Sequence, residues 1–585
     1  MKQVNISQTI MIIALAALLY LFHFSLSGEE PGNKPVFISP VKIPLALSAN
    51  FGELRSDHFH SGLDIKTQGT VGKEVVAAAD GYVYRINVSP GGFGKAVYLR
   101  HHSGYSTVYG HLDRFTPEIE EYVKARQYEE RNFMVTLWPP KDKFSFRQGE
   151  LIAWSGNSGS SNGPHLHYEI RKSAEEIPVN PLLFEFGVMD NIRPVIEKLV
   201  IYPAGKGSRI KNGCKPLVLN LTGSNGKYSV QSSFPVPLSG AAGFGIKAYD
   251  LLNNSHNKCG IYSLELRVDS NLIYSHRMES FSFSETRYIN GHIDYEMLKR
   301  DKIYVERAFV LPNVRLSVHD HVVNRGLFSF SDGKTHQIEI TATDVHGNIS
   351  RLAFRVISVP ESTDSDNSQD TGKDNAIVMP YNRNNRFVSG NVAVSIPSGT
   401  LYDTLWFEFS RSEGGRESFS DIYHIHNNLT PVHKPYSLSI KPLTVAKGKE
   451  SKMLILQISD GSGKIPYKTV WNNGTLSASP NSFGKFYVGI DSIAPVVTAL
   501  GFSDGSNLSG RSSLRIRIRD DLSGIKSYEP LIDDKWALFE YDQKDEVLIY
   551  KFDSSRIKKG SSHSLLVKVT DNVENTKVFS CNFIW

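Results

Sequence analysis

The chain has 585 residues, of which 40% are hydrophobic and 21% are charged, with a formal net charge of +5. This length is too great for one hydrophobic core and predicts roughly three to five domains. A net charge this small, spread over the whole chain, argues against nucleic acid as a partner.

The first 27 residues have the pattern of a secretory signal peptide. Lys2 gives the N-terminal region a positive charge, Ile10–Phe24 is an apolar run, and small residues precede Gly28. The apolar run is shorter than the roughly 20 residues that span a bilayer. We therefore expect secretion across the inner membrane to the periplasm or cell envelope, with a lead-in at 28–47. Membrane contact is expected only if residues 1–27 stay attached as an anchor.

Two short clusters of metal-binding residue types follow. They are His60-Ser61-Gly62-Leu63-Asp64 and His165-Leu166-His167. A catalytic zinc uses imidazole and carboxylate ligands, three from the protein, and keeps one position open. The second cluster reads as a strand, in which residues i and i+2 share a face.

The first cluster needs a bend, because an extended strand would hold His60 and Asp64 about 13 Å apart. Gly62 lies midway and is expected to supply the backbone freedom for that bend. Spacing alone does not decide which of His165 and His167 binds the metal.

The order of these motifs resembles the lysostaphin/LytM-type zinc endopeptidases, which cleave peptide bonds in bacterial peptidoglycan. Tyr109-Gly110-His111-Leu112 lies between the clusters, and Gly156-Asn157-Ser158-Gly159 precedes the second. The resemblance covers 48–186 and implies a LytM-type antiparallel β-sheet catalytic domain. It implies one zinc ion per chain, with His60, Asp64 and His167 as the ligands. It also implies that His111 and His165 are the catalytic pair that handles protons and the oxyanion.

The chemistry of this residue set is coherent. Two neutral imidazoles and one carboxylate leave a zinc site positive, so that it lowers the pKa of bound water to about 7 and polarises a carbonyl. A histidine donor then stabilises the oxyanion or protonates the leaving amine. The expected substrate is the stem or cross-link peptide of peptidoglycan. The alternative is a non-enzymatic envelope module that binds peptidoglycan or activates another hydrolase, but family members of that kind have lost metal ligands.

A second histidine cluster lies far along the chain from this site. His424-Ile425-His426, with His433 nearby, has the same strand spacing but no companion motif. We expect these histidines to face solvent.

Residues 117–127 are the best candidate for a helix. Residues 128–146 are an insertion that either walls the substrate groove or packs on the side of the sheet.

The remainder predicts a mainly β chain. Turn dipeptides such as Asn225-Gly226 and Asn473-Gly474 separate alternating runs such as Leu514–Arg519, which is typical of half-buried antiparallel strands. A repeat is visible: Asp190-x-x-x-Pro194 and Asp491-x-x-x-Pro495 open two copies, and each closes with an Asp-x-x-x-Asn turn. Calcium binding is one interpretation of these turns, but Asp and Asn more commonly cap turns through the local backbone.

The order of the repeat resembles immunoglobulin-like β-sandwiches of bacterial envelope proteins. We assign one sandwich to 187–359, with an insertion around 280–325, and another to 489–585. The Ser/Asp-rich stretch 360–374 is a solvated linker, and 375–488 forms a further β-sandwich. We expect this tail to be dispensable for the chemical step and to position the enzyme or hold an envelope protein partner.

Overall fold

A computed structural model describes residues 35–205, 207–232, 234–360, 377–461 and 463–585. The predicted signal peptide at 1–27 and the linker residues 361–374 lie outside the described residues. The fold is mainly β, which confirms the predicted class. Among the described residues, no helix has both the length and the apolar character that crossing a bilayer requires.

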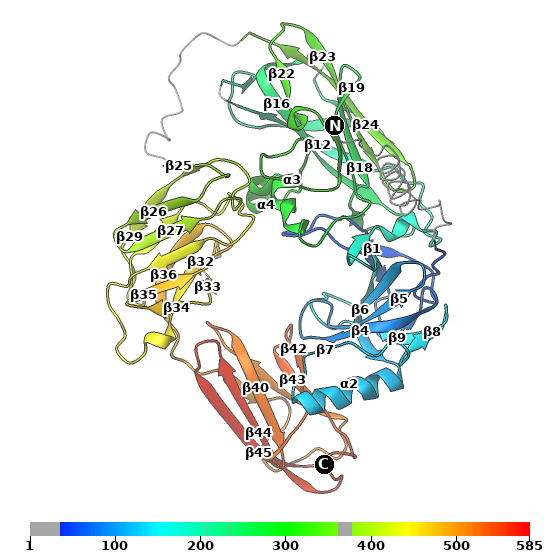
Figure 1. Ribbon diagram of the computed structural model, residues 1–585, viewed down its shortest axis with the longest axis vertical. Helices are drawn as coiled ribbons and strands as arrows, with labels where there is room; N and C mark the ends of the chain where they lie inside the picture. Colours follow the sequence, from blue (N-terminus) through cyan, green and yellow to red (C-terminus); the bar gives the residue numbers. More distant parts are fainter. Residues whose placement is uncertain (1–34, 206, 233, 361–376, 462) are drawn as a thin grey trace, which may run out of the picture.

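The domains follow one another around a closed ring (Figure 1). The chain runs from the first domain (blue to cyan) through the second (green) and third (yellow) to the fourth (orange to red), which lies against the first again. Tyr528, Leu538 and Tyr541 of the fourth domain pack against the core of the first. The two ends of the described chain are therefore joined by tertiary contacts.

The first domain consists of one antiparallel sheet and a helix. Its elements are β1 (Leu47–Ala49), β2 (Leu63–Lys66), β3 (Glu74–Val76), β4 (Gly81–Val88), β5 (Lys95–His101), β6 (Tyr105–Phe115), α2 (Pro117–Glu130), β7 (Val135–Leu137), β8 (Ser145–Phe146), β9 (Leu151–Ser155), β10 (His165–Lys172), β11 (Ile177–Val179) and η1 (Pro181–Leu183). The strand order β1-β2-β10-β6-β5-β4-β7 places β10 between β2 and β6. In this register His167 lies opposite Asp64 on one side and opposite Gly110 on the other.

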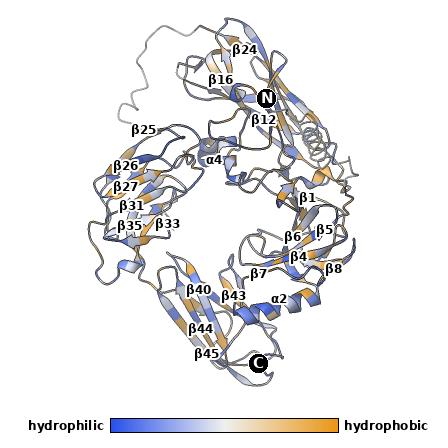
Figure 2. Ribbon diagram, viewed as in Figure 1, coloured by the Kyte–Doolittle hydropathy of each residue, from blue (hydrophilic) through white to orange (hydrophobic). Residues whose placement is uncertain are grey.

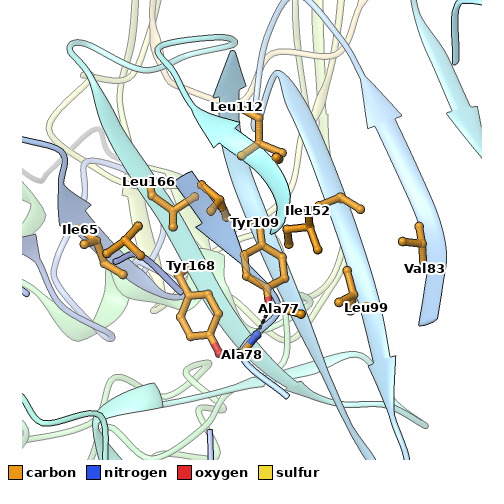
Figure 3. Close-up of a cluster of buried hydrophobic side chains, with 14 of the residues drawn as sticks. Ile65, Ala77, Ala78, Val83, Leu99, Tyr109, Leu112, Ile152, Leu166 and Tyr168 are labelled. Atoms are coloured by element: carbon orange, nitrogen blue, oxygen red, sulfur yellow. Dashed lines mark hydrogen bonds between the residues drawn. The ribbon is translucent and has the colours of Figure 1, made fainter. Parts of the chain in front are cut away.

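The core below this sheet holds β10 in place (Figure 3). Leu166 and Tyr168 of β10 are fully buried, as is Tyr109 of β6. The Tyr109 hydroxyl accepts a hydrogen bond of 2.9 Å from the backbone N–H of Ala78. Burying each such apolar side chain contributes about 1.5–3 kcal/mol. Because side chains alternate along a strand, the same packing turns His165 and His167 to the opposite face.

Helix α2 and the insertion after it lie at the side of the sheet. The helix begins with Pro117 and ends at Glu130, three residues beyond the predicted end. The residue that follows it, Arg131, has a left-handed φ of 48°. Strands β7 and β8, which lie within the 128–146 insertion, pair with β4. The interpretation that this insertion packs on the sheet is therefore the one that the structure supports.

The second domain carries a helical insertion on a curved sheet. Its elements are β12 (Val195–Pro203), β13 (Arg209–Ile210), β14 (Leu217–Ser224), β15 (Lys227–Val230), β16 (Val236–Leu251), β17 (Lys258–Cys259), β18 (Ser263–Val268), β19 (Asn271–Arg277), η2 (Thr286–Tyr288), α3 (Ile289–His292), α4 (Tyr295–Asp301), β20 (Glu306–Arg307), β21 (His319–Val322), η3 (Asn324–Gly326), β22 (Phe328–Phe330), β23 (Thr335–Thr343) and β24 (Ile349–Ser358). The long strand β16 pairs with partners on both sides and joins all these strands into one sheet.

The third domain has two larger sheets that share one hydrophobic core. Its elements are β25 (Ile377–Met379), β26 (Asn385–Ser389), β27 (Val392–Ile396), β28 (Leu405–Phe407), β29 (Phe409–Ser412), β30 (Ile422–Ile425), β31 (Ser437–Ile440), η4 (Glu450–Lys452), β32 (Met453–Ile458), β33 (Lys464–Pro466), β34 (Val470–Asn472), β35 (Thr475–Ala478) and β36 (Gly484–Ile490). Asn473 and Gly474 both have positive φ and close the β34–β35 hairpin, as the dipeptide predicted.

The fourth domain also has two sheets around one core. Its strands are β37 (Val496–Ala499), β38 (Ser506–Asn507), β39 (Ser513–Arg519), β40 (Ile525–Ile532), β41 (Lys535–Trp536), β42 (Glu540–Asp542), β43 (Val547–Lys551), β44 (Ser562–Asp571) and β45 (Thr576–Ile584). Leu514, Ile516 and Ile518 of β39 are buried and the arginines between them are exposed. Figure 2 shows this mixture of hydrophobic and hydrophilic residues along the strands of every domain.

Candidate metal and catalytic site

The structure brings the three predicted metal ligands together on one face of the first sheet. Asp64 Oδ1 lies 3.0 Å from His60 Nε2 and 3.0 Å from His167 Nδ1. Those two nitrogens are 3.2 Å apart. A tetrahedral zinc with bonds of 2.0–2.1 Å needs ligand atoms about 3.3 Å from one another. The residues present therefore fit a zinc ion.

Gly62 permits this geometry for a different reason from the one predicted. Its φ is not in the left-handed region. A Cβ at this position would lie 2.3 Å from the backbone oxygen of Tyr168. The residue is glycine because β2 and β10 approach closely here, so the expectation of special backbone freedom was wrong.

In the metal-binding form, the hydrogen bonds of the two ligand histidines hold the proton of each ring on one nitrogen and leave the other nitrogen for the ion. His60 Nδ1 donates to the backbone oxygen of Asn50 at 2.7 Å, so its Nε2 carries the lone pair. His167 Nε2 donates to Glu169 Oε1 at 3.0 Å, so its Nδ1 carries the lone pair. Such outer partners fix the tautomer of a metal-binding histidine. Both lone pairs are directed at the space beside Asp64 Oδ1.

Glu169 is a functional residue that the sequence analysis missed. Its side chain is fully buried and also accepts from Ser61 Oγ and from the Arg171 guanidinium. Burial opposes its ionisation, but Arg171 and His167 outweigh burial and lower the pKa of Glu169 to about 2. The signal was present in the sequence, because positions 167 and 169 are i and i+2 of one strand and share a face.

The protonation of His167 is set by the same neighbours. Burial alone would lower its pKa, but hydrogen bonds to Asp64 and Glu169 raise the pKa of His167 to about 9. A metal ion that binds at Nδ1 must therefore displace a proton near neutral pH.

His111 and His165 lie beside the three ligands, as the sequence predicted. Their ring centroids are 4.7 Å apart. His111 Nδ1 donates to the Ser158 backbone oxygen and His165 Nδ1 donates to the Gly163 backbone oxygen, each at 2.8 Å. The Nε2 atoms of both rings therefore carry lone pairs. His111 also has a φ of 58°, a costly conformation for a residue with a side chain, and such strain is common at functional sites.

The electrostatic environment keeps His111 neutral. Burial, with His167 and His165 close by, lowers the pKa of His111 to about 3. A neutral imidazole keeps a free Nε2, which can accept a hydrogen bond from a group in the site.

A groove of about 980 Å³ runs over these side chains. Arg55 lies on its wall and binds the second carboxylate oxygen of Asp64 at 3.2 Å. The Phe93 ring stacks on His167 with centroids 4.6 Å apart. Asn257 of the second domain also lines the groove, so the tail contributes to its wall. No residue of the 128–146 insertion is among the described residues that line it.

The second domain holds the His60 segment from two sides. The Asn50 side chain exchanges hydrogen bonds of 2.8 and 2.9 Å with the backbone of Gly260. The backbone N–H of Phe59 donates to Thr286 Oγ1 at 2.9 Å. Phe59 and Phe51 share a buried cluster with residues of the insertion such as Phe281 and Ile289.

The histidines of the third domain lie apart from this site. His424 and His426 are half-buried. Among the described residues, neither belongs to a cluster of side chains that could hold a metal ion. His433 is buried, with its ring stacked on Tyr288 of the second domain at 4.1 Å. The expectation that it faces solvent was wrong, because a domain contact covers it.

The repeated Asp-x-x-x-Asn turns make the hydrogen bonds expected of capping residues. Asp344 accepts from the backbone N–H and the side-chain amide of Asn348. Asp571 accepts the same pair of bonds from Asn575. These bonds are those of the capping interpretation that the sequence favoured.

Comparison with known proteins agrees with this geometry. Residues 58–128 match Peptidase family M23. The chain carries an M23-type peptidase domain. Residues 376–491 match the Zu5-like domain. The lysostaphin/LytM-type resemblance is thereby confirmed for the M23 domain.

Three curated relatives align with the M23 domain. An uncharacterized metalloprotease of Haemophilus influenzae is 40% identical over 124 residues, which are 21% of this chain and 20% of that protein. DD-carboxypeptidase/endopeptidase Mpg of Neisseria meningitidis is 35% identical over 22% of this chain and 23% of its own length. Murein hydrolase activator NlpD of Salmonella typhimurium is 30% identical over 23% of this chain and 28% of its own length. The chain thus spans less than a third of each of these relatives.

Among solved structures, the catalytic domain of the M23 protein EnpA from Enterococcus faecalis is 25% identical. The match covers 25% of this chain and 95% of that one, with a TM-score of 0.19.

Proposed function

We propose that the M23 domain hydrolyses peptide bonds in the stem and cross-link peptides of peptidoglycan, with one zinc ion held by His60, Asp64 and His167. The observation that carries the proposal is the convergence of three ligand atoms within 3.2 Å of one another, each with its lone pair directed inward. When bound, zinc supplies a Lewis acid that activates water and polarises the scissile carbonyl.

His111 and His165 then carry the proton transfers. Each ring holds its Nδ1 proton on a backbone oxygen and has a free Nε2. The Nε2 of His165 lies 3.4 Å from Asp64 Oδ1, which directs this nitrogen at the centre of the site. A free Nε2 in this position can take up a proton from the attacking water. Once protonated, it stabilises the oxyanion and donates to the leaving amine nitrogen.

The names of the relatives support a peptidoglycan substrate and a place in the cell envelope. One relative is named a DD-carboxypeptidase/endopeptidase and another a murein hydrolase activator. The second candidate function is therefore an activator that does not itself cleave. The complete set of ligands and both proton-handling histidines favour the enzyme.

The test is digestion of defined cross-linked muropeptides by the purified chain, with release of new amino termini as the readout. We expect cleavage that a chelator stops and added zinc restores. His111→Ala and His165→Ala should keep the metal and lose more than about 100-fold in turnover, a typical loss for a general acid–base group. His424→Ala is the matched control and should retain full activity.

A different result would favour the activator. In that case the metal-loaded chain would release no amino termini by itself but would accelerate another cell-wall hydrolase. His111→Ala would then leave that acceleration unchanged.

A further inference from the structure

A second group of metal-ligand side chains lies inside the second domain. His276 belongs to β19, His292 is the last residue of α3, and Glu306 begins β20. These residues are 0%, 2% and 4% exposed. His276 Nε2, His292 Nε2 and Glu306 Oε2 are buried without a hydrogen-bond partner. Because native proteins rarely leave buried polar atoms unpaired, three in one place call for an explanation.

The distances between these atoms suit a metal ion better than hydrogen bonds. Glu306 Oε2 lies 3.4 Å from His276 Nε2 and 3.5 Å from His292 Nε2. Hydrogen bonds from N–H to oxygen are normally 2.7–3.2 Å long. Ligand atoms around a tetrahedral zinc are separated by about 3.3 Å. All three atoms lie within 4.8 Å of one another.

The charge balance leads to the same conclusion. Among the described residues, no lysine or arginine pairs with Glu306, and the nearest partners of its carboxylate are the imidazoles of the two histidines. A buried carboxylate without a compensating charge is costly. One divalent cation would neutralise Glu306 and satisfy both imidazole nitrogens at the same time.

Neighbouring side chains are arranged as the outer partners of such a site. The Tyr274 hydroxyl lies 3.1 Å from His276 Nδ1, so its oxygen can accept a hydrogen bond from the Nδ1–H and leave Nε2 free for a metal. His319 lies opposite His276 in the β19–β21 ladder. Its ring centroid is 6.0 Å from that of His292, so His319 borders the group.

We propose that His276, His292 and Glu306 hold a structural zinc ion, with His319 or a water molecule as the fourth ligand. Two imidazoles and one carboxylate are typical zinc ligands, and their burial argues against a substrate at this position. The ion would fasten the helical insertion to the sheet, since His292 and Glu306 lie in the insertion and His276 in a sheet strand.

The proposed ion also supports the wall of the groove. The His292 ring packs edge-on against Phe59 with centroids 5.7 Å apart, and Phe59 directly precedes His60. The second site is independent of the proposed peptidase activity, because it needs no catalytic residue.

The test is elemental analysis of the full chain, purified without a histidine tag and dialysed against buffer with trace zinc. We expect two zinc ions per wild-type chain. Asp64→Ala/His167→Ala should retain one, and adding Glu306→Gln to that variant should remove it. Glu306→Gln keeps the side-chain shape. His336→Gln is the matched control, because His336 is a carboxylate-paired histidine of the same domain outside the group and should change nothing.

Two results would overturn the proposal. One is a zinc content of zero in the folded Asp64→Ala/His167→Ala variant, in which the second group of ligands is unchanged. The other is zinc content that Glu306→Gln leaves unaltered, which would mean that the remaining ion is not held by this group. Neither result depends on catalysis. Failure of the peptidase proposal would be seen in the digestion of muropeptides, and it would leave the zinc content of the second site unaffected.

Discussion

Lys544 of the fourth domain donates a hydrogen bond of 3.3 Å to the backbone oxygen of Ser161, 383 residues earlier in the chain. Its ammonium group also binds the backbone oxygen of Asn157. The Ser161 hydroxyl in turn lies 3.2 Å from Nδ1 of His165. The last domain of the ring therefore braces the loop that orients a proposed proton-handling histidine.

Removing this brace should slow turnover without affecting the metal. We expect Lys544→Met to lower kcat by less than about tenfold, because a charged hydrogen bond contributes about 1.5–3 kcal/mol at most and this one is solvent-exposed. The measurement is steady-state cleavage with zinc content determined on the same samples. Lys526→Met is the control, since Lys526 pairs with Glu574 inside the fourth domain. Equal kinetics for both variants would show that the brace has no role.

The link through Asn50 predicts that the second domain supports the metal site. Asn50→Ala removes two hydrogen bonds to Gly260 while the Asn50 backbone oxygen still accepts from His60. We expect a loss of about 1–3 kcal/mol in stability together with weaker zinc binding. Asn180→Ala is the control, because it removes a hydrogen bond from the Asn180 side chain to the backbone oxygen of Met278. This variant should lose similar stability and keep its zinc affinity.

The same link bears on the expectation that residues 187–585 are dispensable, which stays a prediction. A chain that ends near Phe186 would lose the partners of Asn50 and Phe59. Zinc affinity and cleavage of small soluble peptides by that shorter chain would decide the question.

Glu169 should control metal affinity from outside the ligand set. We expect Glu169→Gln to weaken zinc binding by about 10–100-fold, because the partner of the His167 N–H loses its charge. The variant should also unfold more easily, since Arg171 is left buried with less compensation. Competition with a chromogenic chelator and thermal unfolding measure the two effects. Glu176→Gln is the control, because Glu176 accepts a hydrogen bond from Arg171, whereas the hydrogen-bond partner of the His167 Nε2 is Glu169.

Closure of the ring should depend on pH through Lys95 and Glu540, which form an ion pair of 3.4 Å between the first and fourth domains. Burial opposes the charge on Glu540, but Lys95 and Lys551 outweigh burial and lower its pKa. A carboxyl whose folded pKa is lowered stabilises the contact above its ordinary pKa of about 4.3, and that contribution is lost as pH falls through the folded value.

Small-angle scattering between pH 3 and 7 would measure this opening. We expect the wild-type chain to remain closed at pH 5–7 and to expand below pH 4. Glu540→Gln should weaken closure across the whole range and flatten its pH dependence. Glu574→Gln, which removes an ion pair within the fourth domain, should follow the wild type. Identical curves for Glu540→Gln and the wild type would show that other contacts hold the ring.

Local pattern and motif order were sufficient to predict much of this protein. The alternation in 514–519 predicted β39 and its buried face, because a strand has a period of two. Asn473-Gly474 predicted a hairpin, because both positions need positive φ. The motif order identified His60, His111 and His167 as site residues. The family resemblance assigned their roles, which residue spacing alone could not do.

Only the tertiary structure decided the remaining features. The register of β10 against β2, which sets His167 opposite Asp64, is the physical basis of a ligand choice that the resemblance had only implied. His276, His292 and Glu306 come from a strand, a helix and another strand with irregular spacing, so no sequence periodicity marks them. Lys544 and Ser161 meet because the fourth domain docks on the first. Sequence patterns report the local period of the backbone, whereas these groups depend on which distant surfaces pack together.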